Sequence, residues 1–219
     1  MEKFLARDLG SITYEEAWKL QLSLLEERAD NKIPNTLLLL DHPHVITLGR
    51  KSPEVRAMSE EKIPKSISGI PVHIVERGGE ATYHGPGQLV AYPIFAIPEK
   101  MGPKGFLRVL ENSTIDVLRI YDIGAYFIEE KTGVWLKDAK GQERKIASLG
   151  IALRKNISYH GLALNVSTEL ENFSLISPCG FAPQVMTSLE EIIGKKISLR
   201  EVKEKLQQAI FQRCEEAGL

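Results

Sequence analysis

The chain has 219 residues, of which 43% are hydrophobic and 26% charged, and its formal net charge at pH 7 is −1. This length and composition suffice for one large domain with a substantial core. The near-zero charge argues against a nucleic-acid-binding protein, which would carry a basic surface. The longest apolar run, at residues 36–40, is far too short to span a membrane.

Two further features bear on the cellular location. The amino-terminal stretch MEKFLARDLG has no apolar segment of the kind found in secretory signal peptides. The two cysteines, Cys179 and Cys214, stand far apart and do not form a disulfide framework pattern. We therefore expect a cytoplasmic, reducing environment and no association with membranes.

The order of predicted elements indicates the fold class. A capping-box pattern at residues 13–16 predicts a helix to about Ala29, and apolar spacing predicts further helices at about 106–121 and 198–217. Capping-box patterns also occur at 187–190 and 198–201, whereas the charged residues 50–69 predict an irregular connection. Strands are predicted at residues 36–41, 45–48, 72–76, 89–95, 125–128, 133–136, 146–153 and 159–166. Helices thus flank a block of strands without strict alternation, which favours a mixed α/β or α+β fold in a single domain, residues 1–219, over a doubly wound parallel sheet.

One segment, RGGEATYHGPGQLVAYP from Arg77 to Pro93, concentrates glycine, proline and polar residues between two apolar runs. Glycine lets backbone approach a ligand closely, and such a loop can present N–H groups to a carbonyl, carboxylate or phosphate. A long hairpin turn uses the same residues. The spacing matches neither a P-loop nor a dinucleotide-binding fingerprint. The segment alone leaves both interpretations open.

The histidines and cysteines are individually ambiguous. The five histidines, including His84 in the glycine-rich segment, have no recognised metal-ligand spacing, so we expect no metal site. Cys214 lies on the apolar face of the last predicted helix and is interpreted as a core residue. Cys179, in SPCGF, is consistent with either a structural thiol in a tight turn or one that a substrate can reach. Lys145 precedes the uncharged run IASLGIAL, and is either a strand-edge residue or a buried lysine with a function.

Four segments in this order, RGGEATYHGPGQLVAYP, KIASLGI, HGLALNV and ISPCGF, resemble the lipoyl(octanoyl) transferases, the lipoate-protein ligase B family. They span about residues 77–181, and the length of the chain also fits. Glu80 and Ala81 replace a Gln and a larger residue between the signature positions. The resemblance implies the biotin/lipoate protein ligase catalytic fold, with a larger mixed sheet, a smaller sheet and flanking helices.

The resemblance also implies a reaction. An octanoyl group would pass from octanoyl-acyl carrier protein to a lysine of a lipoyl domain, in E2 subunits of 2-oxoacid dehydrogenases or in glycine cleavage H protein. Cys179 would be the acyl-thioester nucleophile and Lys145 its acid–base partner, in an enzyme that needs no cofactor or ATP. A monomer is the default expectation for the oligomeric state, which the sequence leaves open. By the same resemblance, the substrate-binding positions are Arg77, Gly78, Gly79, Glu80, Ala81, Thr82, Tyr83, His84, Ser148, Leu149, Gly150, Gly161, Leu162 and Ala163.

Two other functions remain as alternatives. An ATP-dependent lipoate or biotin ligase on the same fold would activate a free acid as an adenylate and would not need Cys179. A non-catalytic relative would bind acyl chains or lipoyl domains without transfer. The PCG turn, the absence of a nucleotide-binding signature and the presence of both Lys145 and Cys179 favour the transferase.

Overall fold

The computed structural model describes residues 3–176 and 185–219. Its larger sheet has seven strands in the described part of the chain, in the spatial order β1-β2-β7-β11-β10-β9-β8. Their bounds are β1 (Phe4–Ser11), β2 (Asn35–Asp41), β7 (Gln88–Ile94), β11 (Ile157–Asn165), β10 (Glu143–Arg154), β9 (Lys131–Lys137) and β8 (Tyr126–Ile128). The β1–β2 pair is parallel and the other pairs are antiparallel, so the sheet is mixed.

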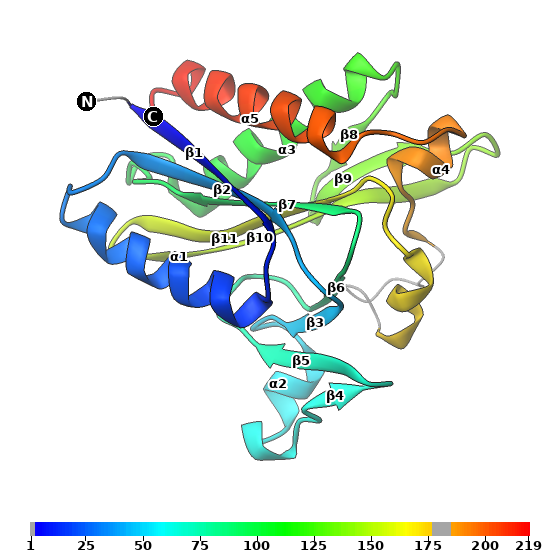
Figure 1. Cartoon of the computed structure of the whole chain (residues 1–219), viewed down its shortest axis with the longest axis horizontal. Helices are drawn as coiled ribbons and strands as arrows, with labels where there is room; N and C mark the ends of the chain where they lie inside the picture. Colours follow the sequence, from blue (N-terminus) through cyan, green and yellow to red (C-terminus); the bar gives the residue numbers. More distant parts are fainter. Residues whose placement is uncertain (1–2, 177–184) are drawn as a thin grey trace.

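A smaller sheet lies below the larger one in Figure 1, in the order β4-β5-β3-β6. Its strands are β4 (Ser66–Ile67), β5 (Ile70–Ile74), β3 (Val45–Leu48) and β6 (Ala81–His84). The two sheets and their flanking helices confirm the predicted fold class, and the mixed larger sheet confirms that the protein is not doubly wound.

Three long helices cover the larger sheet. Figure 1 shows α1 (Tyr14–Ala29) on one face, and α3 (Gly102–Ile120) and α5 (Leu199–Glu216) together on the other. The predicted capping box of α1 is present: Thr13 Oγ1 accepts from Glu16 N, and the Glu16 carboxylate accepts from Thr13 N. The shorter helical elements are α2 (Pro53–Ala57), α4 (Leu189–Ile193) and the 3₁₀ turns Glu60–Lys62 and Leu170–Leu175.

Strand β2 is buried on both faces, which explains why its sequence is continuously apolar. Leu37 and Leu39 pack in the core beneath α3 and α5, whereas Leu38 and Leu40 pack in the core beneath α1. Successive side chains of a strand point to opposite faces, so a strand buried on both faces needs an unbroken apolar run.

Several elements differ from the sequence prediction. Strand β1 carries charged side chains at the edge of the sheet and has no clear apolar alternation, so the sequence did not predict it. Strand β6 lies within the glycine-rich segment that was expected to be a loop. The region 50–69, expected to be irregular, includes α2, one 3₁₀ turn and β4. Helix α4 is capped by Ser188, one residue after the predicted position.

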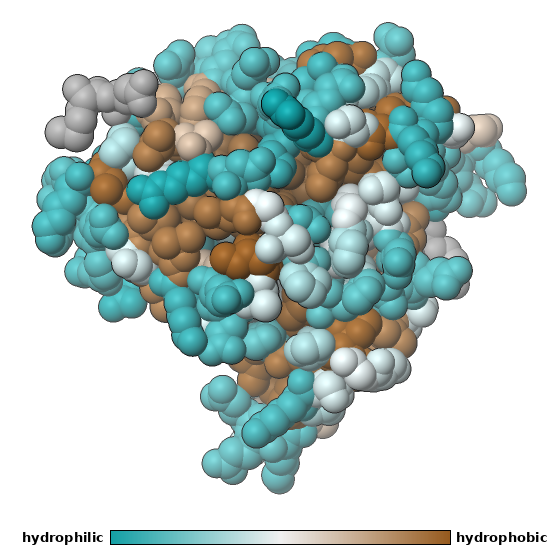
Figure 2. All heavy atoms as spheres, viewed as in Figure 1, coloured by the Kyte–Doolittle hydropathy of each residue, from teal (hydrophilic) through white to brown (hydrophobic). Residues whose placement is uncertain are grey.

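The surface separates polar and apolar side chains. Figure 2 shows that the projecting end formed by α2 and β4 is mainly hydrophilic, while apolar side chains gather in the middle of this face, between α1 and α5. Among the described residues, no helix combines the length and apolar character that crossing a membrane requires.

Candidate active site

The glycine-rich segment connects the two sheets. It leaves the smaller sheet after β5, returns to it as β6, and enters the larger sheet as β7. Its first residues lie against β10, where Gly78 N donates to Ile151 O at 3.1 Å. On its other side, Lys51 N donates to Gly79 O at 3.0 Å. Gly79, with φ 85°, has a backbone conformation that side-chain-bearing residues rarely adopt. The segment is therefore a hydrogen-bonded bridge between the sheets.

A pocket of about 450 Å³, including its open mouth, lies where this bridge meets β10 and β11. Ten of the fourteen predicted substrate-binding residues line it: Arg77, Gly79, Thr82, His84, Ser148, Leu149, Gly150, Gly161, Leu162 and Ala163. Three stretches far apart in the sequence thus meet in one cavity.

The other four predicted binding residues lie elsewhere. Gly78 and Glu80 line an adjacent hollow that shares Gly79, Leu149 and Gly150 with the pocket. Ala81 and Tyr83 point to the opposite face of β6, into the core under the smaller sheet. There the Tyr83 hydroxyl lies 2.7 Å from His44 Nδ1. Successive side chains of β6 point to opposite faces, so Thr82 and His84 face the pocket and Ala81 and Tyr83 face the core.

Two glycines make the close approach of the bridge possible. A Cβ on Gly150 would lie 2.8 Å from Gly78 O and 3.3 Å from Arg77 Cδ. A Cβ on Gly161 would overlap the Ala91 carbonyl oxygen of the neighbouring strand. Side chains at either position would push backbone away from the pocket.

The charge of the pocket comes from Arg77. Arg77 is 7% exposed, and its Nη2 donates to both the carbonyl and hydroxyl oxygens of Thr47, each at 2.8 Å. The nearby histidines are neutral because burial lowers the pKa of His84 to about 3 and that of His42 to about 4. In the described part of the chain, the lining of the pocket thus combines apolar walls, neutral imidazoles and one cation, the Arg77 guanidinium held by Thr47.

Hydrogen bonds fix the orientation of His84. Gln88 Nε2 donates to Asn165 Oδ1 and to the Tyr83 carbonyl, so Gln88 Oε1 remains to accept from His84 Nδ1 at 2.7 Å. Asn165 Nδ2 in turn donates to the Thr187 carbonyl at 3.0 Å. We assign the proton of neutral His84 to Nδ1 from this network.

Lys145 lies on β10 and is 3% exposed. Its side-chain nitrogen, Nζ, is 5.4 Å from the centroid of the Trp135 ring. Met186 pairs with Lys145, and Thr187 N donates to the Lys145 carbonyl at 3.0 Å. The segment that begins at residue 185 therefore lies beside Lys145. Cys179 lies outside the described residues.

Three residues that line the pocket were not predicted from the sequence as binding residues: Tyr14, Tyr92 and His160. Tyr14 was assigned only to a helix start, and Tyr92 only to an apolar strand. His160 begins the HGLALNV motif and has φ 56°, an uncommon backbone conformation for a residue other than glycine. A polar aromatic residue within an otherwise apolar run is the signal that could have identified Tyr92 and His160.

Comparisons with known proteins agree with this geometry. Residues 13–211 match the lipoyl protein ligase A/B catalytic domain. An octanoyltransferase of Bacteroides fragilis is 40% identical over 210 residues, covering 93% of this chain and 95% of the relative. The chain belongs to the octanoyltransferase family. This confirms the resemblance drawn from the four segments.

Solved structures support the fold of the family at greater distance. A bipartite lipoate protein ligase from Thermoplasma acidophilum aligns with a TM-score of 0.68 and 18% identity, covering 97% of this chain and 83% of that one. The biotin protein ligase from Aquifex aeolicus aligns with a TM-score of 0.53 and 16% identity, covering 99% and 71%. This octanoyltransferase-family chain therefore shares the lipoate/biotin ligase catalytic fold.

Proposed function

We propose that the protein transfers an octanoyl group from octanoyl-acyl carrier protein to a lysine of a lipoyl domain, without ATP. The acceptors would be E2 subunits of 2-oxoacid dehydrogenases and glycine cleavage H protein. The observation that carries the proposal is a buried lysine, Lys145, on the strand that also supplies Ser148, Leu149 and Gly150 to an apolar pocket. Family membership supports the octanoyl group as the cargo.

In the first half-reaction, Cys179 takes the acyl group from the carrier. The reactive form of a cysteine is the thiolate, which a neighbouring ammonium stabilises. Lys145 accepts the thiol proton, and the Cys179 sulfur attacks the thioester carbonyl. The carbon–sulfur bond to the carrier then breaks, and the departing pantetheine sulfur takes the proton from Lys145.

In the second half-reaction, the lysine amine of the lipoyl domain attacks the Cys179 thioester. A carbon–nitrogen bond forms, the bond to Cys179 breaks, and Lys145 carries the proton lost by the amine to the cysteine sulfur. Exchange between thioesters is close to thermoneutral and amide formation from a thioester is favourable, so neither half-reaction requires nucleotide activation. The ten predicted positions that line the pocket would hold the acyl group.

The test is intact-mass analysis of the protein mixed with octanoyl-acyl carrier protein, without ATP or acceptor. We expect an octanoyl adduct that disappears when a lipoyl domain is added. Cys179→Ala should abolish the adduct, and Lys145→Ala should slow its formation by about a hundredfold or more, the scale of a lost general acid–base group.

Cys214→Ala is the matched control. Cys214 is fully buried on α5, and burial raises the pKa of its thiol to about 12, so its loss should leave the adduct unchanged. Modification of the lipoyl domain only with ATP and free octanoate would contradict the proposal and favour an adenylating ligase. Transfer that survives Cys179→Ala would exclude the thioester intermediate.

A further inference from the structure

A buried carboxylate lies on α3, in the layer behind the candidate active site. Glu111 is 4% exposed, which is uncommon for a glutamate unless its charge is paired. Its Oε1 accepts from Gly133 N at 3.0 Å, and its Oε2 accepts from Arg108 Nη1 at 2.8 Å. Both carboxylate oxygens are therefore engaged, one by the backbone of β9 and one by a guanidinium.

Arg108 is itself held in place. Its Nη2 donates to Glu129 Oε1 at 3.1 Å, and its guanidinium carbon lies 3.3 Å from the centre of the Phe127 ring. Burial raises the pKa of Glu111, whereas the Gly133 N–H and the charges of Arg108 and Lys145 act to lower it. The carboxylate is thus fixed in position and interacts electrostatically with Lys145.

Gly133 forms the contact between this carboxylate and the lysine. Its φ of 139° lies in the range that side-chain-bearing residues rarely adopt. A Cβ there would overlap Lys145 Cε and would lie 3.1 Å from Lys145 Nζ and 2.8 Å from the Ala147 carbonyl oxygen. The bare backbone of Gly133 is therefore a wall of the space that the lysine side chain occupies.

We propose that Glu111 is a positioning residue for Lys145: by accepting from Gly133 N, it holds this stretch of β9 against the lysine side chain. Lys145 Nζ then lies close to the Gly133 backbone and 5.4 Å from the centroid of the Trp135 ring. This inference rests on the proposed function, because a positioned lysine matters for turnover only if Lys145 moves protons.

If Glu111 only stabilised the fold, its substitution would have different effects. Its loss would lower the stability of the protein but would leave the side chain of Lys145 and the turnover of the folded fraction unchanged. The two roles are therefore separated by measuring the lysine itself, turnover and stability on the same variants.

The experiment uses four variants. Glu111→Leu removes the acceptor for Gly133 N, and Glu111→Asp withdraws it by one methylene while keeping the charge. Glu111→Gln keeps an oxygen that can accept from Gly133 N. Glu129→Gln is the matched control, because it removes the exposed carboxylate that also pairs with Arg108 but does not contact Gly133.

The first measurement is the NMR resonance of Lys145 Cε in protein labelled with [¹³Cε]lysine, assigned with Lys145→Arg. We expect a shift in the Leu and Asp variants, a smaller one in Glu111→Gln, which removes the charge but keeps the hydrogen-bond acceptor, and none in Glu129→Gln. The second is octanoyl transfer, where the Leu and Asp variants should lose about tenfold or more in kcat with KM little changed, the cost of a misplaced catalytic group. Glu111→Gln should restore most of kcat. Thermal midpoints show that each variant is folded.

An unmoved Lys145 resonance with kcat within about twofold of the parent, in folded Leu or Asp variants, would overturn the inference. Failure of Glu111→Gln to restore kcat would also overturn it, since the role would then not be the hydrogen bond. If the unmodified protein transfers no octanoyl group, the proposed function fails, while the resonance still reports whether Glu111 positions Lys145.

Discussion

At the scale of single residues, the pocket depends on two glycines, which have no side chain. Gly150 and Gly161 carry no Cβ, and each faces a backbone carbonyl oxygen that a Cβ would displace. Backbone oxygens cannot rotate away as flexible side chains can, so the bridge or the neighbouring strand would have to move. The width of the pocket is therefore set by main chain.

Gly150→Ala tests this view. The added methyl group would press on Gly78 O and Arg77 Cδ, and overpacking of this kind costs about 1–3 kcal/mol of stability. We expect octanoyl transfer to fall by about tenfold, with a smaller loss for a butanoyl donor, measured as kcat/KM for both carriers.

Gly124→Ala is the control, because Gly124 has nothing within 4 Å of an added Cβ. Its kcat/KM values should match those of the parent. An equal loss for octanoyl and butanoyl donors in Gly150→Ala would show that the substitution does not act by narrowing the acyl pocket.

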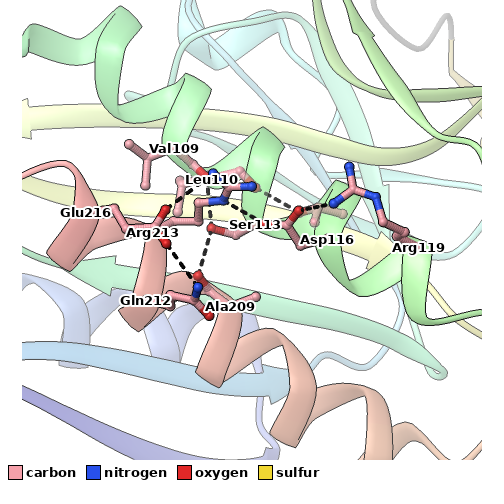
Figure 3. A network of polar contacts seen from close by, with 10 residues as sticks. Val109, Leu110, Ser113, Asp116, Arg119, Ala209, Gln212, Arg213 and Glu216 are labelled. Carbon is pink, nitrogen blue, oxygen red and sulfur yellow. Dashed lines mark hydrogen bonds and ion pairs between the residues drawn. The ribbon is translucent and has the colours of Figure 1, made fainter.

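At the scale of elements, α3 and α5 are joined by polar contacts as well as by the core. Figure 3 shows Asp116 of α3 between Arg213 of α5 and Arg119 of its own helix. Arg213 Nε donates to Asp116 Oδ2 at 2.6 Å, and Ser113 Oγ lies 3.4 Å from the Ala209 carbonyl. Because α3 also carries Glu111, these contacts help to fix the position of the helix that lies behind Lys145.

The hydrogen bond from Arg213 and the charges of both arginines hold the pKa of Asp116 below its usual value. A lowered carboxyl pKa contributes stability above the unfolded-state pKa, and that stability is lost as the pH falls through the folded-state pKa. We expect Asp116→Asn to lower the free energy of unfolding by about 0.5–1 kcal/mol at pH 7, since the pair is partly exposed.

Urea unfolding at pH 7 and pH 3 measures this effect. The difference between parent and Asp116→Asn should shrink at the lower pH and with added salt. A difference that is the same under all conditions would assign the loss to packing rather than to charge.

At the scale of the whole molecule, neutral imidazoles occupy the junction between the sheets. His84 belongs to the smaller sheet, His160 to the larger one, and His42 follows β2. His42 Nδ1 donates to the Ile12 carbonyl at 2.7 Å, and its Nε2 lies 2.9 Å from the Tyr92 hydroxyl. Burial lowers the pKa of all three imidazoles.

The junction should therefore be sensitive to acid. An unfolded histidine binds a proton near pH 6.5 but folded His42 only near pH 4, so this histidine's contribution to stability falls as the pH drops between these values. The slope is about 1.4 kcal/mol per pH unit for each such group.

Urea midpoints at pH 7, 6 and 5 check this expectation. His42→Gln should lose less stability between pH 7 and pH 5 than the parent does. The control is His73→Gln, which removes a partly buried histidine that also lies against Tyr14. An acid loss that is undiminished in His42→Gln would place the sensitivity elsewhere.

The sequence by itself determined much about this protein where local physics is sufficient. The capping pattern at Thr13, the doubly buried run of β2 and the apolar face of α5 each follow from neighbours in the chain. The four family segments also supplied the prediction that Lys145 is catalytic, and they include the ten predicted binding residues that line the pocket. The capping pattern, the strand and the helix face need no knowledge of distant residues.

The tertiary structure alone decided which side chains share a space. The direction in which Thr82 and Tyr83 point depends on the pairing of β6 with β3, because one position along a strand reverses the face. Tyr14, Tyr92 and His160 reach the pocket only when α1, β7 and β11 pack together. Glu111 meets Gly133 across 22 residues of chain, and no local pattern records a contact that depends on how α3 lies on the sheet.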